Sequence, residues 1–426
     1  MFFLYKILTN FFYPFFVIII WLRKFLKKEH SLRYKEKIFA SYFNVKRNKD
    51  SKLIWFHAAS VGEVKSILPI IDKLNQTQLK INFLLTTVTL SSANLAGEEL
   101  KGIKNIQHRF FPLDISFLIK KFLKSWSPDA IFLVDSEIWP NLIMSARENK
   151  IPISIINARI TSKTFKRWKL FPKTAEKIFN SFDLCLSSNQ ETMEFLSHFK
   201  MKNIFYTGNI KLVSKTSQFK IKNVNQKFLS ENKFWLAAST HKGEEIFCLK
   251  THLKIKENHK NIITIIAPRH INRILEIKKK CDNFNLTSQI LNKDDLILEN
   301  KEIILINSFG VLPSFFNYAK SVFIGKSLIE SLKQEGGQSP IEAAKLGCFI
   351  YHGKYVYNFQ EIYKILHQNN ISKEISSYDE LANLIIKDFM KTKEKEKSLK
   401  LFNDLGEKIF SETMKQINNF LSNGVK

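Results

Sequence analysis

The residue best placed for chemistry in this sequence is Glu63, which ends the segment Ile54-Trp55-Phe56-His57-Ala58-Ala59-Ser60-Val61-Gly62-Glu63. The small residues of this segment allow the backbone to approach a ligand. A carboxylate beside a bound ligand can exchange a proton with it. Equally, an acidic residue in the first turn of a helix stabilises that helix. Ser60 is better explained as a helix N-cap than as a nucleophile, because the Gly-x-Ser-x-Gly pattern is absent.

A second acidic group, Asp135-Ser136-Glu137, follows another apolar run and precedes Pro140. An Asp-x-Glu pair could bind a divalent metal, but no second acidic cluster accompanies it. We interpret Glu137 as a carboxylate that faces the substrate. A helix-start carboxylate ahead of Pro140 explains the same pattern equally well.

Cationic and small polar residues follow four further apolar runs. Arg159 and Lys211 would suit phosphate or carboxylate ligands, or could be solvated surface charges. Ser239-Thr240-His241 precedes a helix, which is typical of an anion-binding turn or of a capping box. Pro268-Arg269-His270 places two potential cations directly after a predicted strand.

Two glycine-containing turns complete the set of candidate sites. Ser308-Phe309-Gly310-Val311 offers backbone amides beside a glycine. Gly336-Gly337 leads into Ser339-Pro340-Ile341-Glu342, where free amides at a helix start could bind phosphate and Glu342 could accept hydrogen bonds from ribose hydroxyls. Ordinary capping of a helix by the preceding loop would look similar.

Alternating strands and helices position these residues. The first series of predicted strands is Leu53–His57, Ile81–Thr86, Ala130–Val134, Ile153–Asn157, Leu184–Ser187 and Ile204–Tyr206. The second series is Phe234–Ala238, Ile262–Ala267, Glu302–Ile306, Ser321–Ile324 and Cys348–His352. The alternation predicts two α/β domains with parallel, doubly wound sheets, joined by a polar linker over 213–225. The candidate residues would then face a cleft between the domains.

Length and charge agree with two domains and an anionic partner. The chain has 426 residues, and its 66 Lys and Arg against 39 Asp and Glu give a net charge of +27. Nucleic acid, acidic lipid or a phosphorylated substrate could be that partner, although compositional bias explains the excess of lysine about as well. The four cysteines are far apart, which indicates free thiols rather than disulfides or a zinc site. The full Gly-x-Gly-x-x-Gly pattern is absent, so no nicotinamide or flavin cofactor is indicated.

The N-terminal segment is strongly apolar. Residues 1–22 carry a single charge, Lys6, and the basic residues Arg23, Lys24, Lys27 and Lys28 follow at once. This pattern favours an uncleaved membrane anchor, either spanning or in plane, with the body of the protein in the cytoplasm. The alternative is a buried N-terminal helix of a soluble protein.

Taken in order, these motifs resemble the 3-deoxy-D-manno-octulosonic acid (Kdo) transferases of lipopolysaccharide assembly. The resemblance rests on His-Ala-Ala-Ser-Val-Gly-Glu at 57–63, Ser-Glu-Ile-Trp-Pro-Asn at 136–141, Asn-Ala-Arg at 157–159, Gly-Asn-Ile-Lys at 208–211, Ser-Thr-His-Lys-Gly-Glu-Glu at 239–245, Pro-Arg-His at 268–270, Gly-Gly-Gln-Ser-Pro-Ile-Glu at 336–342 and Asn358-Phe359. The usual Asn-Pro-Leu-Glu-Pro of the family stands here as Ser339-Pro340-Ile341-Glu342-Ala343.

The resemblance implies a GT-B glycosyltransferase with two Rossmann-like domains facing a central cleft. It implies a membrane-anchor helix over 1–30, an acceptor domain over 31–213 and a CMP-Kdo donor domain over 214–426. It also implies CMP-Kdo as the donor and lipid IVA as the acceptor, at the cytoplasmic face of the inner membrane. No cofactor, metal or nucleic acid is expected.

The family's functional residues map onto individual positions of this sequence. Glu63 falls at the proton acceptor, and Glu137 and Lys211 fall at residues associated with transition-state stabilisation. The positions that correspond to CMP contacts are Pro268, Arg269, Phe309, Gly310, Val311, Ser339, Pro340, Ile341 and Glu342. Further substrate contacts are expected at Ser60, Arg159, Ser239, His241 and Asn358.

Two other functions remain open from the sequence. One is a different GT-B enzyme of envelope synthesis that uses a UDP-sugar. The other is a membrane-anchored RNA-binding protein, suggested by the net charge of +27, although no RNA-recognition motif supports it.

Overall fold

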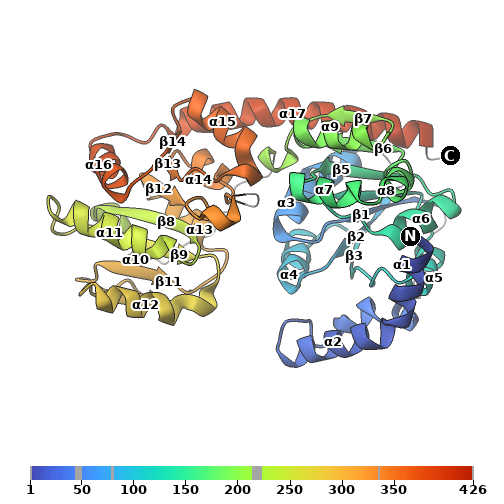
Figure 1. Ribbon diagram of the computed structural model, residues 1–426, viewed down its shortest axis with the longest axis horizontal. Helices are drawn as coiled ribbons and strands as arrows, with labels where there is room; N and C mark the ends of the chain where they lie inside the picture. Colours follow the sequence, from blue (N-terminus) through green and yellow to red (C-terminus); the bar gives the residue numbers. More distant parts are fainter. Residues whose placement is uncertain (1, 44–49, 78–80, 214–222, 334–335, 425–426) are drawn as a thin grey trace. The chain divides into compact units, whose positions relative to one another are not determined.

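The computed structural model describes residues 2–43, 50–77, 81–213, 223–333 and 336–424 (Figure 1). The chain divides into two compact units. One comprises Met1–Ser214 together with Leu405–Lys426, and the other comprises Lys215–Asp404. The sequence prediction placed all of 214–426 in one domain, whereas Leu405–Lys426 groups with the first unit. Most of the linker predicted over 213–225 lies outside the described residues.

The first unit contains a seven-stranded parallel sheet with the order β3-β2-β1-β4-β5-β6-β7. Its strands are β1 (Lys52–His57), β2 (Ile81–Thr87), β3 (Ile106–Phe110), β4 (Ala130–Val134), β5 (Ile153–Ala158), β6 (Leu184–Ser187) and β7 (Ile204–Tyr206). In the register, Phe56 of β1 lies beside Leu85 of β2 and Phe132 of β4. The strand order reverses between β1 and β4. The loops after these two strands therefore flank the position where open α/β sheets bind ligands.

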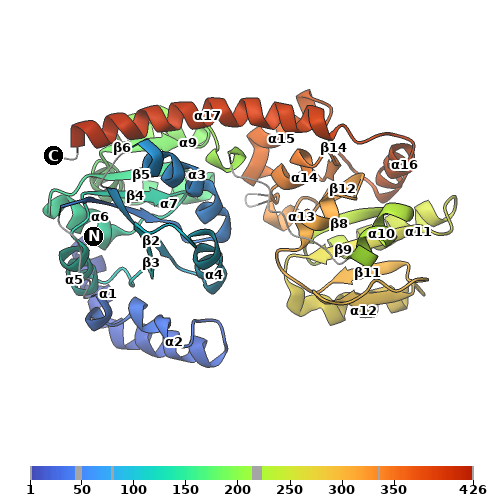
Figure 2. The same cartoon turned by 180° about the vertical axis from the view of Figure 1, so that it is seen from behind.

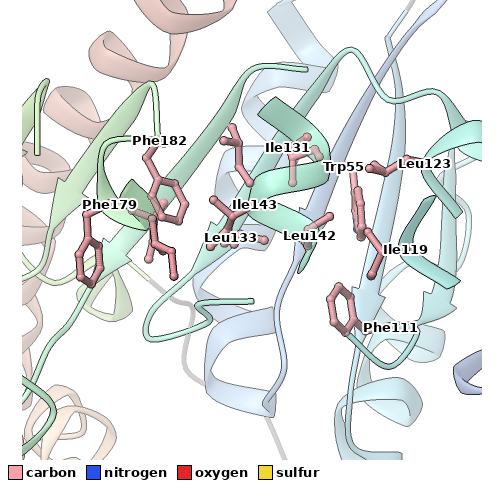
Figure 3. Packing of buried hydrophobic residues seen from close by; sticks show 14 of the residues in the cluster. Trp55, Phe111, Ile119, Leu123, Ile131, Leu133, Leu142, Ile143, Phe179 and Phe182 are labelled. Carbon is pink, nitrogen blue, oxygen red and sulfur yellow. The ribbon is translucent and has the colours of Figure 1, made fainter. Parts of the chain in front are cut away.

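Helices cover both faces of this sheet (Figure 1). The helices of this unit are α1 (Phe2–Phe11), α2 (Tyr13–Phe25), α3 (Val61–Thr77), α4 (Leu90–Glu99), α5 (Ser116–Trp126), α6 (Pro140–Glu148), α7 (Ser162–Lys169), α8 (Pro172–Phe179), α9 (Gln190–His198) and α17 (Lys395–Gly424). Of these, α1 lies beside α5, and α2 extends away from the sheet (Figure 1). Successive residues of a strand point to opposite faces. Trp55 accordingly packs under α5 and α6 in one cluster (Figure 3), and Phe56 packs under α3 and α17 in the other. Burial on both faces explains the unbroken apolar runs of the strands.

The second unit repeats this architecture with its own seven-stranded parallel sheet, in the order β10-β11-β9-β8-β12-β13-β14. Its strands are β8 (Phe234–Thr240), β9 (Ile263–Pro268), β10 (Ser288–Leu291), β11 (Ile303–Ile306), β12 (Ser321–Ile324), β13 (Phe349–His352) and β14 (Ser372–Glu374). Its helices are α10 (Asn223–Glu231), α11 (Glu244–Lys256), α12 (Ile274–Asn283), α13 (Leu312–Phe316), α14 (Ile341–Lys345), α15 (Gln360–Gln368) and α16 (Tyr378–Asp388). The strand order here reverses between β8 and β12.

The prediction of two parallel-sheet α/β domains is confirmed, but it missed three strands. Strands β3, β10 and β14 each lie at an edge of a sheet. Each of these strands has at most two buried residues. The central strands β4, β5 and β9, in contrast, are buried throughout. These three strands lack the continuous apolar run by which the other strands were recognised.

The N-terminal apolar segment does not form the single anchor helix predicted for 1–30. It is divided into α1 and α2, with Pro14 at the start of α2. Among the described residues, no one helix is both long and apolar enough to cross a membrane, while α1 and α2 taken together meet the same criteria as a pair bent by 57°. Tyr5 and Tyr13 attach these helices to the first unit through hydrogen bonds to Asp114 and to the backbone of Ile38.

The packing of α17 against the first unit can be tested at Ile417. Figure 2 shows the C-terminal part of this helix beside the first sheet, and Ile417 is fully buried there. We expect Ile417→Ala to lower the free energy of unfolding of the first unit by about 2–5 kcal/mol, because it leaves a cavity. Asn418→Ala, at an exposed position of the same helix, is the control in urea denaturation. Equal stability of the two variants would contradict this packing.

Candidate active site

Glu63 lies in the first turn of α3, with its carboxylate directed back toward the preceding turn. Its Oε2 accepts a hydrogen bond from the backbone N–H of Ala59 at 2.7 Å, and its Oε1 accepts one from the hydroxyl of Ser60 at 2.6 Å. Ser60 Oγ in turn accepts from the backbone N–H of Glu63 at 3.4 Å. The hydroxyl of Ser60 therefore caps the start of α3, which confirms the N-cap interpretation of Ser60, while the carboxylate of Glu63 bonds the backbone of Ala59 instead of that of Ser60. Glu63 is only 8% exposed.

The surroundings of Glu63 raise the pKa of its carboxyl group above the usual range. Burial is the largest cause, and the negative charges of Asp135 and Glu137 act in the same direction. The hydrogen bond from Ser60 and the positive charge of Lys211 oppose this shift. The predicted catalytic residues Glu63, Glu137 and Lys211 are therefore close enough to influence one another electrostatically. A raised pKa makes Glu63 a stronger proton acceptor than a free glutamate.

Glu137 follows β4, and both of its hydrogen-bond partners contact the same carboxylate oxygen. Its Oε2 accepts hydrogen bonds from Trp139 Nε1 at 2.8 Å and is 3.3 Å from His57 Nε2. Both partners belong to the motifs described above, but no role was predicted for either. Their positions could have indicated such a role, because His57 ends β1 and Trp139 follows β4, and the strand order reverses between these two strands.

Lys211 forms an ion pair with Asp135 rather than remaining a solitary cation. Asp135 directly follows β4 with a φ of +64°, a left-handed conformation that aspartate tolerates better than most residues. Lys211 lies in a short 3-10 helix, Ile210–Leu212, and the side chain of Asn157 accepts the backbone N–H of Ile210 at 3.0 Å. From the sequence, Asp135 was considered only as part of a possible metal-binding Asp-x-Glu pair, and Asn157 was given no role. Arg159 contacts the same loop through its backbone N–H, which donates to Asp135 O at 3.3 Å.

The second unit has a buried carboxylate at the corresponding reversal of its sheet. Glu244, the first residue of α11, is 1% exposed and accepts four backbone N–H groups. One comes from His241 after β8, at 2.8 Å, and three come from residues 326–328 after β12, at 2.7 to 3.1 Å. Glu244 therefore fixes the two loops that flank this reversal. A side chain at Gly325 would collide with this arrangement, since its Cβ would lie 2.5 Å from Ser239 O.

The predicted donor residues lie in loops after the strands of this second sheet. Pro268 ends β9, and Arg269 is exposed just beyond it, with its backbone N–H bonded to Thr240 O at 3.0 Å. Burial, with the charges of Lys326 and Arg269 adding to it, lowers the pKa of His241 below its usual value. His241 is therefore neutral at pH 7, and its ring lies 5.7 Å from that of His270.

The remaining donor candidates belong to two turns. Phe309 is 65% exposed, Gly310 has a φ of +80°, and Val311 is buried at the start of α13. Ser339, Pro340, Ile341 and Glu342 lead into α14, and Asn358 donates its backbone N–H to Gly336 O at 2.9 Å. All of these candidates belong to the second unit, whereas Glu63, Glu137 and Lys211 belong to the first. Within the described chain, no group of three or more His, Cys, Asp or Glu residues is arranged to hold a metal ion.

Comparison with known structures identifies the class of fold. The chain is similar to a UDP-GlcNAc 2-epimerase from Neisseria meningitidis, with a TM-score of 0.58 and 15% identity over 87% of this chain and all of that one. At this identity the likeness concerns the fold alone. The protein therefore shares the two-domain, parallel-sheet α/β fold of this epimerase.

Sequence comparison identifies the family within this class. Residues 33–214 match the family described as 3-Deoxy-D-manno-octulosonic-acid transferase (kdotransferase). A probable mitochondrial 3-deoxy-D-manno-octulosonic acid transferase from Arabidopsis thaliana is 33% identical over 75% of this chain and 72% of its own length. The enzyme of that name from Haemophilus influenzae is 28% identical over 81% of each chain. The chain belongs to the Kdo transferase family and is a glycosyltransferase.

The hydrogen bond from Ser60 to Glu63 gives a testable shift in pKa. This bond stabilises the ionised carboxylate, so Ser60→Ala should raise the pKa of Glu63 further. Carboxyl ¹³C NMR titration measures this value, with the signal assigned by its loss in Glu63→Gln. Ser66→Ala is the control, because Ser66 Oγ donates to the backbone oxygen of Glu63 and not to its carboxylate. An unchanged or lowered pKa in Ser60→Ala would contradict the prediction.

Proposed function

We propose that this protein transfers Kdo from CMP-Kdo to lipid IVA, as an inverting glycosyltransferase of lipopolysaccharide biosynthesis. Membership of the Kdo transferase family supports the sugar and the reaction class. The observation that carries the proposed chemistry is the buried carboxylate of Glu63, which has a raised pKa and lies beside Glu137 and Lys211.

In the proposed reaction, Glu63 accepts the proton of an acceptor hydroxyl. The hydroxyl oxygen then forms a bond to the anomeric carbon of Kdo, while the bond from that carbon to the phosphate oxygen of CMP breaks. Attack from the face opposite CMP inverts the configuration. Glu137 and Lys211 stabilise the charge that develops around the sugar in the transition state.

The second unit would hold the donor nucleotide. Arg269 is exposed at the end of β9, where its guanidinium can pair with the phosphate of CMP. Phe309, Gly310 and Val311 after β11, and the segment from Ser339 to Glu342, would contribute the remaining contacts to CMP. Transfer therefore requires residues of both units.

The first experiment measures transfer by the purified full-length protein from freshly generated CMP-Kdo to lipid IVA. We expect Glu63→Gln to lower kcat by about 10²- to 10⁴-fold, the usual contribution of a general base, with CMP binding unchanged. Glu99→Gln, at an exposed position of α4, is the matched control and should retain full activity.

The same assay separates the alternatives. Wild-type protein that binds CMP but transfers no Kdo would point to a different acceptor. Thermal stabilisation by UDP and not by CMP would favour an enzyme that uses a UDP-sugar. Full activity in Glu63→Gln would exclude this residue as the base.

We also propose that α1 and α2 attach the protein to the cytoplasmic face of the inner membrane. Their outer surface carries Phe3, Phe11 and Phe15, which are 73%, 74% and 57% exposed, and the basic residues 23, 24, 27 and 28 follow. Exposed aromatic side chains beside cations suit the interface of an anionic bilayer. These helices would lie in the plane of the membrane, because Tyr5 and Tyr13 attach them to the first unit.

Flotation with vesicles that contain phosphatidylglycerol tests this attachment. Replacing both Phe11 and Phe15 by Asp should reduce the bound fraction about tenfold or more, because apolar area is lost and negative charge is added. Leu275→Asp is the control, since Leu275 is 65% exposed on α12 of the second unit. Equal losses in the two variants, or none in either, would contradict attachment through α1 and α2.

A further inference from the structure

A buried histidine, His57, connects the core of the first sheet to the carboxylate of Glu137. The side chain of His57 is fully buried at the end of β1. Its ring lies against that of Phe111, with centroids 4.0 Å apart and 26° between the planes. Its Nε2 lies 3.3 Å from Glu137 Oε2. An imidazole packed in this way has little freedom to turn, so the atom that faces Glu137 is fixed.

The partners of the other ring nitrogen allow it to act as a hydrogen-bond acceptor. His57 Nδ1 lies 3.0 Å from Thr86 Oγ1, and the same hydroxyl oxygen lies 2.8 Å from Trp55 Nε1. An indole N–H only donates, so Thr86 Oγ1 accepts from Trp55 and can donate its own hydrogen to Nδ1. Nδ1 then acts as the acceptor. Because a carboxylate oxygen only accepts, the hydrogen between the ring and Glu137 is then carried by Nε2.

The opposite tautomer would be unfavourable here. A hydrogen on Nδ1 could donate to the backbone oxygen of Thr86, which lies 3.3 Å away. The lone pair of Nε2 would then face a carboxylate oxygen of Glu137, and two acceptors would oppose each other in a buried site. The contacts on both sides of the ring favour the Nε2–H form.

Both donors to Glu137 bind the same oxygen. Oε2 receives His57 Nε2–H and Trp139 Nε1–H, and in the described part of the chain no hydrogen bond reaches Oε1. Two donors from one side stabilise the ionised form of a carboxylate and fix its orientation. Oε1 is therefore the oxygen that remains available to a substrate.

We propose that His57 is a positioning residue for transfer, which holds Glu137 as an oriented carboxylate through Nε2–H. Thr86 and Trp55 set its tautomer. The proposal rests on the role of Glu137 in the proposed function. It also explains why this buried position against the ring of Phe111 carries an imidazole rather than a phenyl ring.

Two substitutions separate the hydrogen bond from the packing. His57→Phe keeps a flat ring against Phe111 without an N–H donor, and His57→Gln keeps an N–H donor of similar reach. We expect His57→Phe to lower kcat about 10- to 100-fold with both KM values within about twofold, and His57→Gln to recover most of the loss. His252→Phe, at another fully buried histidine in the second unit, is the control. Loss in His57→Gln equal to that in His57→Phe would overturn the proposal.

A double-mutant cycle tests whether His57 acts through Glu137. If it does, adding His57→Phe to Glu137→Gln should reduce kcat by less than about threefold beyond the single Glu137→Gln variant. If the reductions in kcat of the two single variants multiply in the double variant, His57 acts independently of Glu137.

Imidazole ¹⁵N NMR of the full chain tests the tautomer without any assay of transfer. The signal of His57, identified by its absence in His57→Gln, should show a protonated Nε2 and an unprotonated Nδ1. An Nδ1–H tautomer would overturn the proposal even in an active enzyme. Protein with the Nε2–H form and no Kdo transfer would contradict the proposed function and leave the orientation of Glu137 standing.

Discussion

The candidate active site depends on the cost of removing carboxylates from water. Glu63 lies near Asp135 and Glu137 beyond the carboxyl ends of β1 and β4, and their negative charges disfavour the ionised form of Glu63. The protein compensates each one differently. Glu63 receives neutral donors from Ala59 and Ser60, Asp135 receives the charge of Lys211, and Glu137 receives ring N–H groups. Burial is the largest cause of the raised pKa of Glu63, the residue proposed to accept a proton, and the negative charges of Asp135 and Glu137 add to it.

The second unit also contains a buried carboxylate, but there it has a structural role. Glu244 is almost completely buried and has four backbone N–H groups around its two oxygens, so its charge is used to connect loops. The loops it connects follow β8 and β12, between which the sheet order reverses. Both units therefore place a buried glutamate at the start of the helix after the first strand of the sheet. In the first unit it lies among further charged side chains, and in the second it holds the backbone.

Much of this arrangement could be predicted from the sequence, and the failures have physical causes. Central strands were recognised because burial on both faces requires an unbroken apolar run, as in β4. The edge strand β14 has no buried residue and gave no such signal. The pairing of Lys211 with Asp135 joins positions 76 residues apart, which no local pattern reports. The grouping of 405–426 with the first unit depends on tertiary packing of residues such as Phe420 against Phe132.

The two interpretations of Glu63 that the sequence left open are compatible. Capping the helix requires the carboxylate to turn back toward Ala59 and Ser60, and this turn brings it into a buried position at the reversal of the sheet. Burial then raises its pKa, which a solvent-exposed helix-start glutamate would not experience. A capping carboxylate that remained in water would be a weak proton acceptor at neutral pH. Capping the helix thus keeps the Glu63 carboxylate in the buried environment that raises its pKa, and this raised pKa suits its proposed role as a proton acceptor.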